Sequence, residues 1–191
     1  MAYLIFGILV FGGLHLFSIL LPVQRDRLEL SLGEKLWKAL YALLSLAGLG
    51  LMIWGFMLSR AEPLGADELY APPDWARHAA MLLVLLGFIS VGASHGKGYL
   101  RLWLQNPMSI GIGLWATAHL LANGTRADVY FFGTFLVVAL LDIVFSMSRG
   151  KAPVHEPQLR SDIIATIVGM VLYVIFLLGF HPYVLNVPVA G

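Results

Sequence analysis

The sequence contains no cysteine and very little charge. The absence of cysteine excludes disulfides, thiolate metal sites and catalytic thiols, but it says nothing of the redox compartment. Charged residues make up 12% of the chain and hydrophobic residues 59%, whereas a soluble domain carries about 25% charged residues. We therefore expect an integral membrane protein with the lipid bilayer as its main partner.

Several catalytic signatures are also missing. The chain has no H-E-x-x-H, no G-x-S-x-G and no Walker glycine loop, so a zinc hydrolase, a serine hydrolase of that type and a P-loop nucleotide-binding protein are not expected. The net charge of +1 offers no basic surface for a nucleic-acid partner. The function is to be sought within the membrane.

What the sequence does contain is a series of long apolar runs. A membrane-spanning helix needs about 20 apolar residues, so the 191 residues allow about six spans with short loops. The predicted fold is an all-α, polytopic bundle that forms a single transmembrane domain over residues 1–191. The six predicted helices cover residues 2–21, 36–58, 78–94, 107–123, 129–146 and 162–180.

Local signals mark the ends of these helices. Ser31 and Glu34 have the spacing of a capping box before the second helix. Pro107 suits the first position of the fourth helix, and Asn123 with the glycine after it suits the end of that helix. Residues 59–77 are predicted to form a loop, and residues 99–104 a short amphipathic helix along the membrane surface.

The basic residues predict the orientation, because lysine and arginine gather on the cytoplasmic side. Three alternate loops and their flanks hold nine of them: Arg25, Arg27, Lys35, Lys38, Lys97, Arg101, Arg149, Lys151 and Arg160. The opposite side holds only Arg60, Arg77 and Arg126. Both termini are therefore predicted to face the periplasm, with an uncleaved first span and a short, uncharged translocated tail after His181.

Small residues recur at the spacing of helix-packing faces. They are Ser109, Gly113 and Thr117 in the fourth helix, and Gly48 and Gly55, with Met52 between them, in the second. Such positions let helix backbones approach closely in lipid. Plain helix packing is the first interpretation, and space beside the helix for a flat cofactor is the alternative.

Two histidines lie inside apolar runs, His15 in the first helix and His119 in the fourth. An ionisable residue within a span is a functional-site hypothesis by default, and two imidazoles on different helices suit a haem or another metal. The first and fourth helices run in opposite directions, and each histidine lies somewhat past the midpoint of its helix. At a rise of about 1.5 Å per residue, their alpha carbons are therefore expected to lie roughly 10 Å apart along the membrane normal. Both readings, metal ligands and hydrogen-bonded packing residues, stay open at this point.

Residues one helical turn away lie on the same face as each of these two histidines and are expected to surround its ring. They are Trp115 and Asn123 for His119, and Phe11, Gly12 and Ser18 for His15. Ser18 or Asn123 is predicted to fix the tautomer of a ligand ring.

The remaining polar groups are weaker candidates. His78, His95 and His181 lie at helix ends, where solvation is expected, and His155 lies in a loop. Asp142 is the carboxylate placed well inside a span, at a cost of at least about 2.5 kcal/mol at mid-membrane. It is predicted to face the bundle interior, either in a hydrogen bond to a helix neighbour or a basic residue, or as a proton relay.

Two segments carry a resemblance to a known family. LGEKLWKALYALLSLAGL and NPMSIGIGLWATAHLLANG, with the histidine of the first helix, resemble the NnrU family of bacterial membrane proteins over nearly the whole chain. The family is in turn similar to the plant 15-cis-zeta-carotene isomerase, an integral membrane haem b protein. The resemblance implies haem b as the cofactor, His15 and His119 as the axial iron ligands, and a link to nitrite and nitric oxide metabolism.

The chain departs from the family pattern at two places. The family commonly has R-H-P before the fourth helix, where this chain has Gln105-Asn106-Pro107. The isomerase has a cysteine three residues before the histidine of the fourth helix, where this chain has Ala116. A thiolate–histidine ligand switch is therefore excluded, which weakens the transfer of isomerase activity but leaves bis-histidine ligation possible.

Four functions follow from these observations. The first is a haem b-binding protein of the bacterial inner membrane. The second is a haem-dependent cis–trans isomerase of a carotenoid-like polyene, with an apolar substrate that enters from the lipid. The third is a methyltransferase of the isoprenylcysteine type, disfavoured because Asn106 stands where its motif needs a histidine. The fourth is a cofactor-free accessory membrane protein.

Overall fold

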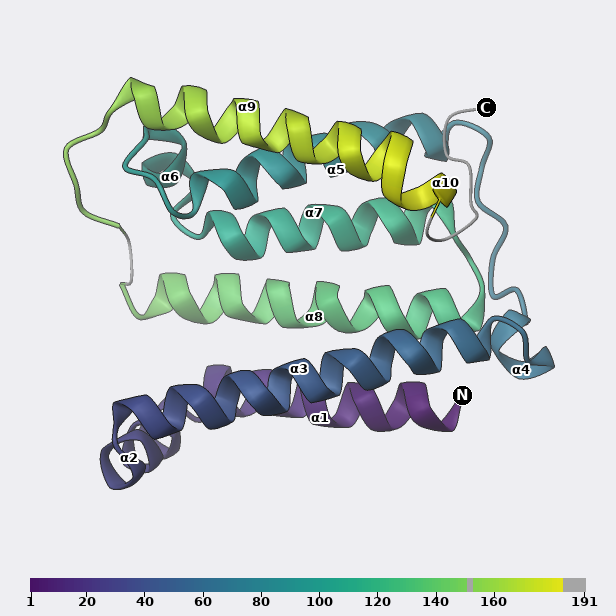
Figure 1. Ribbon diagram of the computed structural model, residues 1–191, viewed down its shortest axis with the longest axis horizontal. Coiled ribbons are helices and arrows are strands. Elements are labelled where there is room, and N and C mark those ends of the chain that lie inside the picture. Colours follow the sequence, from purple (N-terminus) through teal and green to yellow (C-terminus); the bar gives the residue numbers. More distant parts are fainter. Residues whose placement is uncertain (151–152, 184–191) are drawn as a thin grey trace.

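The computed structural model describes residues 1–150 and 153–183, almost all of them in helices (Figure 1). In chain order the elements are α1 (Ala2–Leu20), α2 (Pro22–Leu32), α3 (Glu34–Ser59), α4 (Pro63–Ala66), α5 (Ala76–Ala93), α6 (Tyr99–Leu104), α7 (Pro107–Ala122), α8 (Arg126–Ser148), α9 (Leu159–Ile175), the π-helical turn η1 (Phe176–Phe180) and α10 (His181–Tyr183). The predicted all-α fold is confirmed.

Five helical segments of the described chain are long and apolar enough to cross a membrane. They are α1, α3, α5, α8 and the continuous segment from α9 to α10. The sixth predicted span, α7, has 16 residues and falls short of the length expected for a full crossing. The protein is a multi-pass membrane protein, and α7 is a short helix enclosed by its neighbours α5 and α8.

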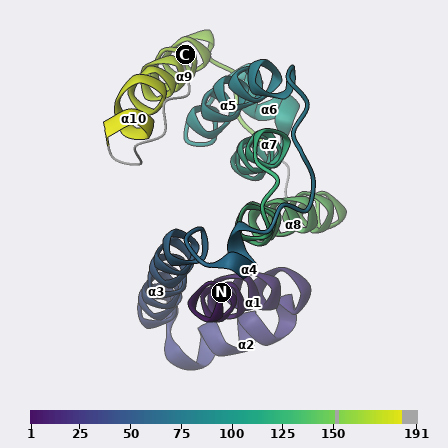
Figure 2. The same ribbon diagram turned by 90° about the vertical axis from the view of Figure 1, so that its right-hand side faces the viewer.

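The long helices form a curved row rather than a closed bundle (Figure 2). Neighbours in the row are α3, α1, α8, α7, α5 and α9, in that order. The row bends so that α3 and α9 form the two arms of an arc, and the concave side lies between them. Helix α8 therefore stands between α1 and α7, the helices that carry His15 and His119.

Glycines bring α1 and α3 into close contact. A Cβ atom at Gly48 would lie 2.8 Å from the backbone nitrogen of Phe11, and one at Gly55 would collide with the backbone of Leu4. Gly48, Met52 and Gly55 are all buried in this contact. Backbones this close gain dispersion contacts that lipid cannot match. The packing interpretation of these small residues is confirmed, because α1 fills the space beside them.

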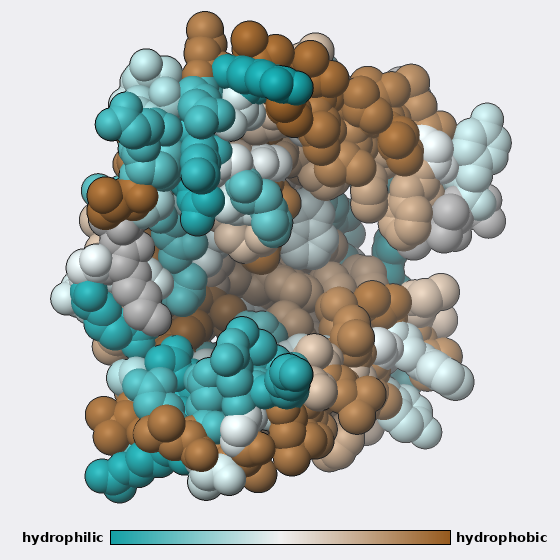
Figure 3. Space-filling view, turned by 60° about the vertical axis from the view of Figure 1, so that its left-hand side comes forward, coloured by the Kyte–Doolittle hydropathy of each residue, from teal (hydrophilic) through white to brown (hydrophobic). Residues whose placement is uncertain are grey.

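The outer faces of the helices are apolar and exposed. Leu9 of α1, Leu43 and Trp54 of α3 each expose between 64% and 66% of their surface. Hydrophilic residues gather instead at one end of the molecule (Figure 3). In Figure 1 this end carries α2 and α6, with the N-terminus at the opposite end. Lipid around the apolar belt accounts for the exposure of these side chains.

The end of the molecule opposite α2 is closed by the segment between α3 and α5. Glu68 forms an isolated antiparallel bridge with Thr125. The Tyr70 hydroxyl donates to the carbonyl of Leu120 and, at 2.8 Å, to that of Asn123. These bonds use carbonyls that the end of α7 leaves without helical partners. The predicted loop is thus ordered over the end of α7.

Sequence reasoning missed α2 and misplaced one cap. Ser31 lies inside α2, where its hydroxyl donates to the carbonyl of Leu28. The residue before α3 is Gly33, with φ of 81°, and no side chain caps that helix. The predicted capping box of Ser31 and Glu34 is therefore wrong, because α2 continues through Ser31 and a left-handed glycine makes the turn. Lys151 and the segment after Tyr183 lie outside the described residues.

Candidate functional site

His15 and His119 share one backbone arrangement. Nδ1 of His15 lies 2.8 Å from the carbonyl oxygen of Phe11, and Nδ1 of His119 lies 2.8 Å from that of Trp115. In both cases the carbonyl belongs to the residue four positions earlier. A carbonyl can only accept, so each Nδ1 carries the hydrogen and each Nε2 is left with a free lone pair. This is the tautomer of a histidine that ligates a metal through Nε2.

Ser18 or Asn123 was predicted to fix the tautomer of a histidine ring. In the structure, backbone carbonyls fix both tautomers instead. The Asn123 side chain donates to the carbonyl of His119 at 2.9 Å and stabilises the end of α7 instead. Ser18 lines the cavity beside His15. Both predicted residues lie next to their histidines, but neither holds a ring nitrogen in the described structure.

His15 faces a cavity of about 330 Å³ between α1, α3, α7 and α8. The centroid of its ring lies 4.2 Å from that of Phe11 and 5.6 Å from that of Tyr41. Apolar side chains such as Ile112 form much of the wall. Two cations, Arg25 and Arg149, also line this cavity. Asp142 also lines it, and Arg25 is paired with Asp26, so the cavity combines an apolar wall with charges of both signs.

Asp142 lies in the same cavity and has three polar partners. Asn106 Nδ2 donates to Oδ2 at 2.8 Å, Ser109 Oγ donates to Oδ2 at 2.6 Å, and Ser146 Oγ lies 3.3 Å from Oδ1. The predicted hydrogen bond to a helix neighbour is confirmed by Ser146, and α7 supplies the other two donors. Asn106 thus ties the start of α7 to α8.

His15 and His119 are not neighbours. Phe135 of α8 contacts Phe11 and Trp115, with ring centroids 5.2 Å and 5.3 Å apart. We call these three residues the aromatic layer. Helices α1 and α7 run in opposite directions (Figure 1), so His15 and His119, each four residues beyond its own layer residue, lie on opposite sides of the layer. A rise of 1.5 Å per residue separates their alpha carbons by about 12 Å along the helices.

His119 is surrounded by rings from three elements. Its centroid lies 4.9 Å from Trp115, 4.5 Å from Phe132 of α8 and 6.2 Å from His181 of α10. Trp115 was predicted as a neighbour of His119, and this contact is confirmed. The contacts of Phe132 and His181 were not predicted, since only the folded chain brings these side chains of α8 and α10 to His119.

His181 repeats the arrangement of the other two histidines. Its Nδ1 lies 2.8 Å from the carbonyl oxygen of Phe176, five residues earlier. The side chain is half-buried rather than freely solvated, which differs from the sequence expectation for a helix end. The sequence did hold one indication of this contact. The predicted orientation of the helices places His181 and His119 near the same face of the membrane.

Of the other histidines, His78 lies in the first turn of α5, and His95 and His155 lie outside the helices. Nδ1 of His95 lies 2.8 Å from the hydroxyl of Ser94, and Nε2 of His155 lies 3.1 Å from the carbonyl of Gly98. Within residues 1–150 and 153–183 no group of three histidine, aspartate or glutamate side chains forms a metal cluster.

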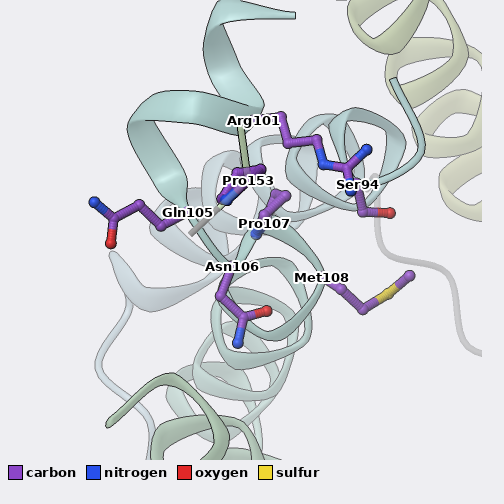
Figure 4. Close-up of a pocket in the computed structure, with 7 residues that line it drawn as sticks. All are labelled: Ser94, Arg101, Gln105, Asn106, Pro107, Met108 and Pro153. Atoms are coloured by element: carbon purple, nitrogen blue, oxygen red, sulfur yellow. The ribbon is translucent and has the colours of Figure 1, made fainter. Parts of the chain in front are cut away.

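A second cavity, of about 200 Å³, lies where α6 meets α7 (Figure 4). Its lining residues are Ser94, Arg101, Gln105, Asn106, Pro107, Met108 and Pro153. Arg101 donates to the carbonyl of Gly96 at 2.9 Å, and the Asn106 side chain points away from Arg101 in Figure 4 toward its bond with Asp142. This cavity is small and its polar groups serve local contacts.

Comparison with known protein families identifies this chain over nearly its whole length. The family model described as NnrU protein matches residues 3–189, nearly the whole chain. Neither the curated proteins nor the solved structures contain a match to this chain.

Proposed function

The chain belongs to the NnrU family, and from this membership and the histidine geometry we propose that it is a haem b-binding protein of the bacterial inner membrane. The observation that carries the proposal is the shared arrangement of three histidines. His15, His119 and His181 each bond a backbone carbonyl through Nδ1. Each therefore offers a basic Nε2 within an apolar helical protein, where an unpartnered imidazole is costly.

His119 is the strongest candidate ligand. It is surrounded by Trp115 and Phe132, and such an apolar, aromatic setting suits the flat porphyrin and limits access of water to the iron. Bound haem would supply one-electron redox chemistry or ligand sensing, the chemistry that nitrite and nitric oxide metabolism requires. The protein's part is to fix the imidazole tautomer and to exclude water.

The second ligand is a separate question. The family resemblance favours His15, and the pair of His15 and His119 stays a prediction. His15 has the correct tautomer and faces a cavity lined by Arg149, a positive group that suits a propionate of a haem. The aromatic layer between the two rings stands against a single iron shared by this pair.

An optical spectrum of the detergent-purified protein tests the proposal directly. We expect a Soret band, a sharp α-band after reduction with dithionite, and about one haem per chain in a pyridine haemochrome assay. Replacement of His119 by alanine should abolish stable binding. A wild-type protein without a Soret band, even after haem addition, would reject haem binding and favour a cofactor-free accessory protein.

A haem-dependent isomerase of a carotenoid-like polyene is the second candidate. The apolar wall of the cavity beside His15 and the concave side between α3 and α9 (Figure 2) favour an apolar ligand that enters from the bilayer. Product analysis with a poly-cis carotenoid tests this candidate. Unchanged isomer composition with the reduced, haem-loaded protein would exclude it.

A further inference from the structure

We propose that His181, rather than His15, completes a bis-imidazole site with His119 for the haem iron. The site lies between α7 and the turn from η1 to α10. The inference rests on the proposed haem function and changes its ligand set. It departs from what the family resemblance implies and comes from the contacts of the folded chain.

The distance between the two rings fits a shared metal ion. The ring centroids of His119 and His181 are 6.2 Å apart, with an angle of 23° between the ring planes. A metal ion about 2 Å from each of two imidazole nitrogens sets the centroids about 6 Å apart, because each centroid lies about 1 Å behind its nitrogen. The two rings are already at this separation.

Both rings also expose the required nitrogen. Nδ1 of His119 and Nδ1 of His181 are each 2.8 Å from a backbone carbonyl, that of Trp115 and that of Phe176. The carbonyls set the same tautomer on two different helices and leave two Nε2 atoms free. A neutral imidazole has one donor and one acceptor nitrogen, and in both rings the backbone carbonyl satisfies only the donor, so a common metal ion would satisfy both Nε2 acceptors.

The π-helical turn η1 determines where His181 points. It covers Phe176–Phe180 and directly precedes His181. Such turns insert one residue into an α-helix and are frequent at functional sites. One residue rotates everything that follows by about 100° relative to a continuous α-helix. Without the insertion, the side chain of His181 would point about 100° away from its present direction.

His15 satisfies the tautomer condition but not the distance condition. It lies on the far side of the aromatic layer of Phe11, Phe135 and Trp115, and its ring contacts Phe11 and Tyr41. Side chains on a helix lean toward its N-terminus. This brings the rings of His15 and His119 closer together than their alpha carbons, but it shortens the separation of about 12 Å only in part. For His15 to reach the iron bound by His119, the rings of the layer would have to move aside.

Spin-state measurements on single variants test this assignment. The full-length protein is purified in detergent, loaded with haem b, and studied by absorption and electron paramagnetic resonance. The wild type should be low-spin. His119→Ala and His181→Ala should lose the low-spin signal or the haem itself, and His15→Ala should keep both. His95→Ala, at the other end of the molecule, is the matched control.

Added imidazole separates loss of a ligand from loss of the fold. In His181→Ala it should restore the low-spin signal, because the free base can occupy the vacated space. Deletion of Gly179, which has no neighbour within 4 Å of an added Cβ, removes the extra residue of η1 and should act like His181→Ala. A low-spin His181→Ala with a high-spin His15→Ala would overturn this assignment but leave the haem function intact. A wild type that binds no haem would overturn both.

Discussion

At the scale of single residues, the structure explains how polar side chains persist inside apolar helices. The polar groups of the candidate site have local partners: His15 and His119 bond carbonyls of their own helices, and Asp142 accepts from Asn106 and Ser109. A buried acceptor or donor without a partner costs about 1–3 kcal/mol. These pairs therefore hold the side chains in one conformation as well as stabilising them.

Replacement of Asn106 tests the link between α7 and α8. Asn106→Ala removes the donor to Asp142 and the cap that accepts from the backbone of Ser109. We expect a loss of about 1–2 kcal/mol in the free energy of unfolding, measured as a lower thermal midpoint in detergent. Gln105→Ala, which has no such bonds, is the control. Equal midpoints for the two variants would contradict the role of Asn106.

The hydroxyl of Tyr70 makes the stability of the fold depend on pH in the alkaline range. Burial, and to a lesser degree the charge of Asp128, raise the pKa of Tyr70 above its usual value. A raised pKa in the folded state means that the stabilisation is complete below the unfolded pKa of about 10 and is lost as pH rises through the folded pKa. The phenolate can no longer donate to the carbonyls of Leu120 and Asn123.

We therefore expect the thermal midpoint of the wild type to fall above about pH 10 more steeply than that of Tyr70→Phe, which lacks the donor at every pH. Other tyrosines titrate equally in both proteins, so the difference between the two curves isolates Tyr70. Parallel curves would show that this hydroxyl does not couple to the fold.

At the scale of helices, close packing depends on particular glycines. A Cβ at Gly55 would collide with the backbone of Leu4, whereas Gly50, on the same helix, has nothing within 4 Å of an added Cβ. Gly55→Ala should lower the free energy of unfolding by about 1–3 kcal/mol, because a backbone cannot give way as a side chain can. Gly50→Ala should be neutral or slightly stabilising. Thermal unfolding in detergent measures both, and a stable Gly55→Ala would argue against the α1–α3 contact.

The helices also show where local patterns succeed. The predicted surface helix over residues 99–104 matches α6, and Pro107 begins α7 as expected, since proline and glycine act through local geometry. Helix α2 was missed because its 11 residues mix charged and apolar side chains without a clear apolar face. The Ser31–Glu34 motif failed for the same reason, as it lies across the end of an unrecognised helix.

At the scale of the whole molecule, the charge distribution predicts how the protein sits in the membrane. The end that carries α2 and α6 is hydrophilic (Figures 1 and 3) and should face the cytoplasm, with the N-terminus at the periplasmic face. The chain has no cysteine, so single introduced cysteines report their side without background. Val154 is 96% exposed near the first end and Leu64 is 57% exposed in α4, near the other.

A membrane-impermeant maleimide should thus label Leu64→Cys in spheroplasts and Val154→Cys only in inverted vesicles. The unmodified protein is the blank for both preparations. Reversed labelling would invert the predicted orientation, and labelling of both variants from one side would contradict the arrangement of the two ends.

The sequence by itself determined the membrane class, the apolar runs that become helices, and the presence of His15 and His119 within them, because hydropathy, proline and glycine act over a few neighbouring residues. The tertiary structure decided which helices meet. Side chains far apart in the sequence become neighbours only through packing, so the insertion of α8 between α1 and α7, the donors to Asp142 and the approach of His181 to His119 had no local signal. The candidate ligands were visible in the sequence, but their pairing depends on the curvature of the helical row.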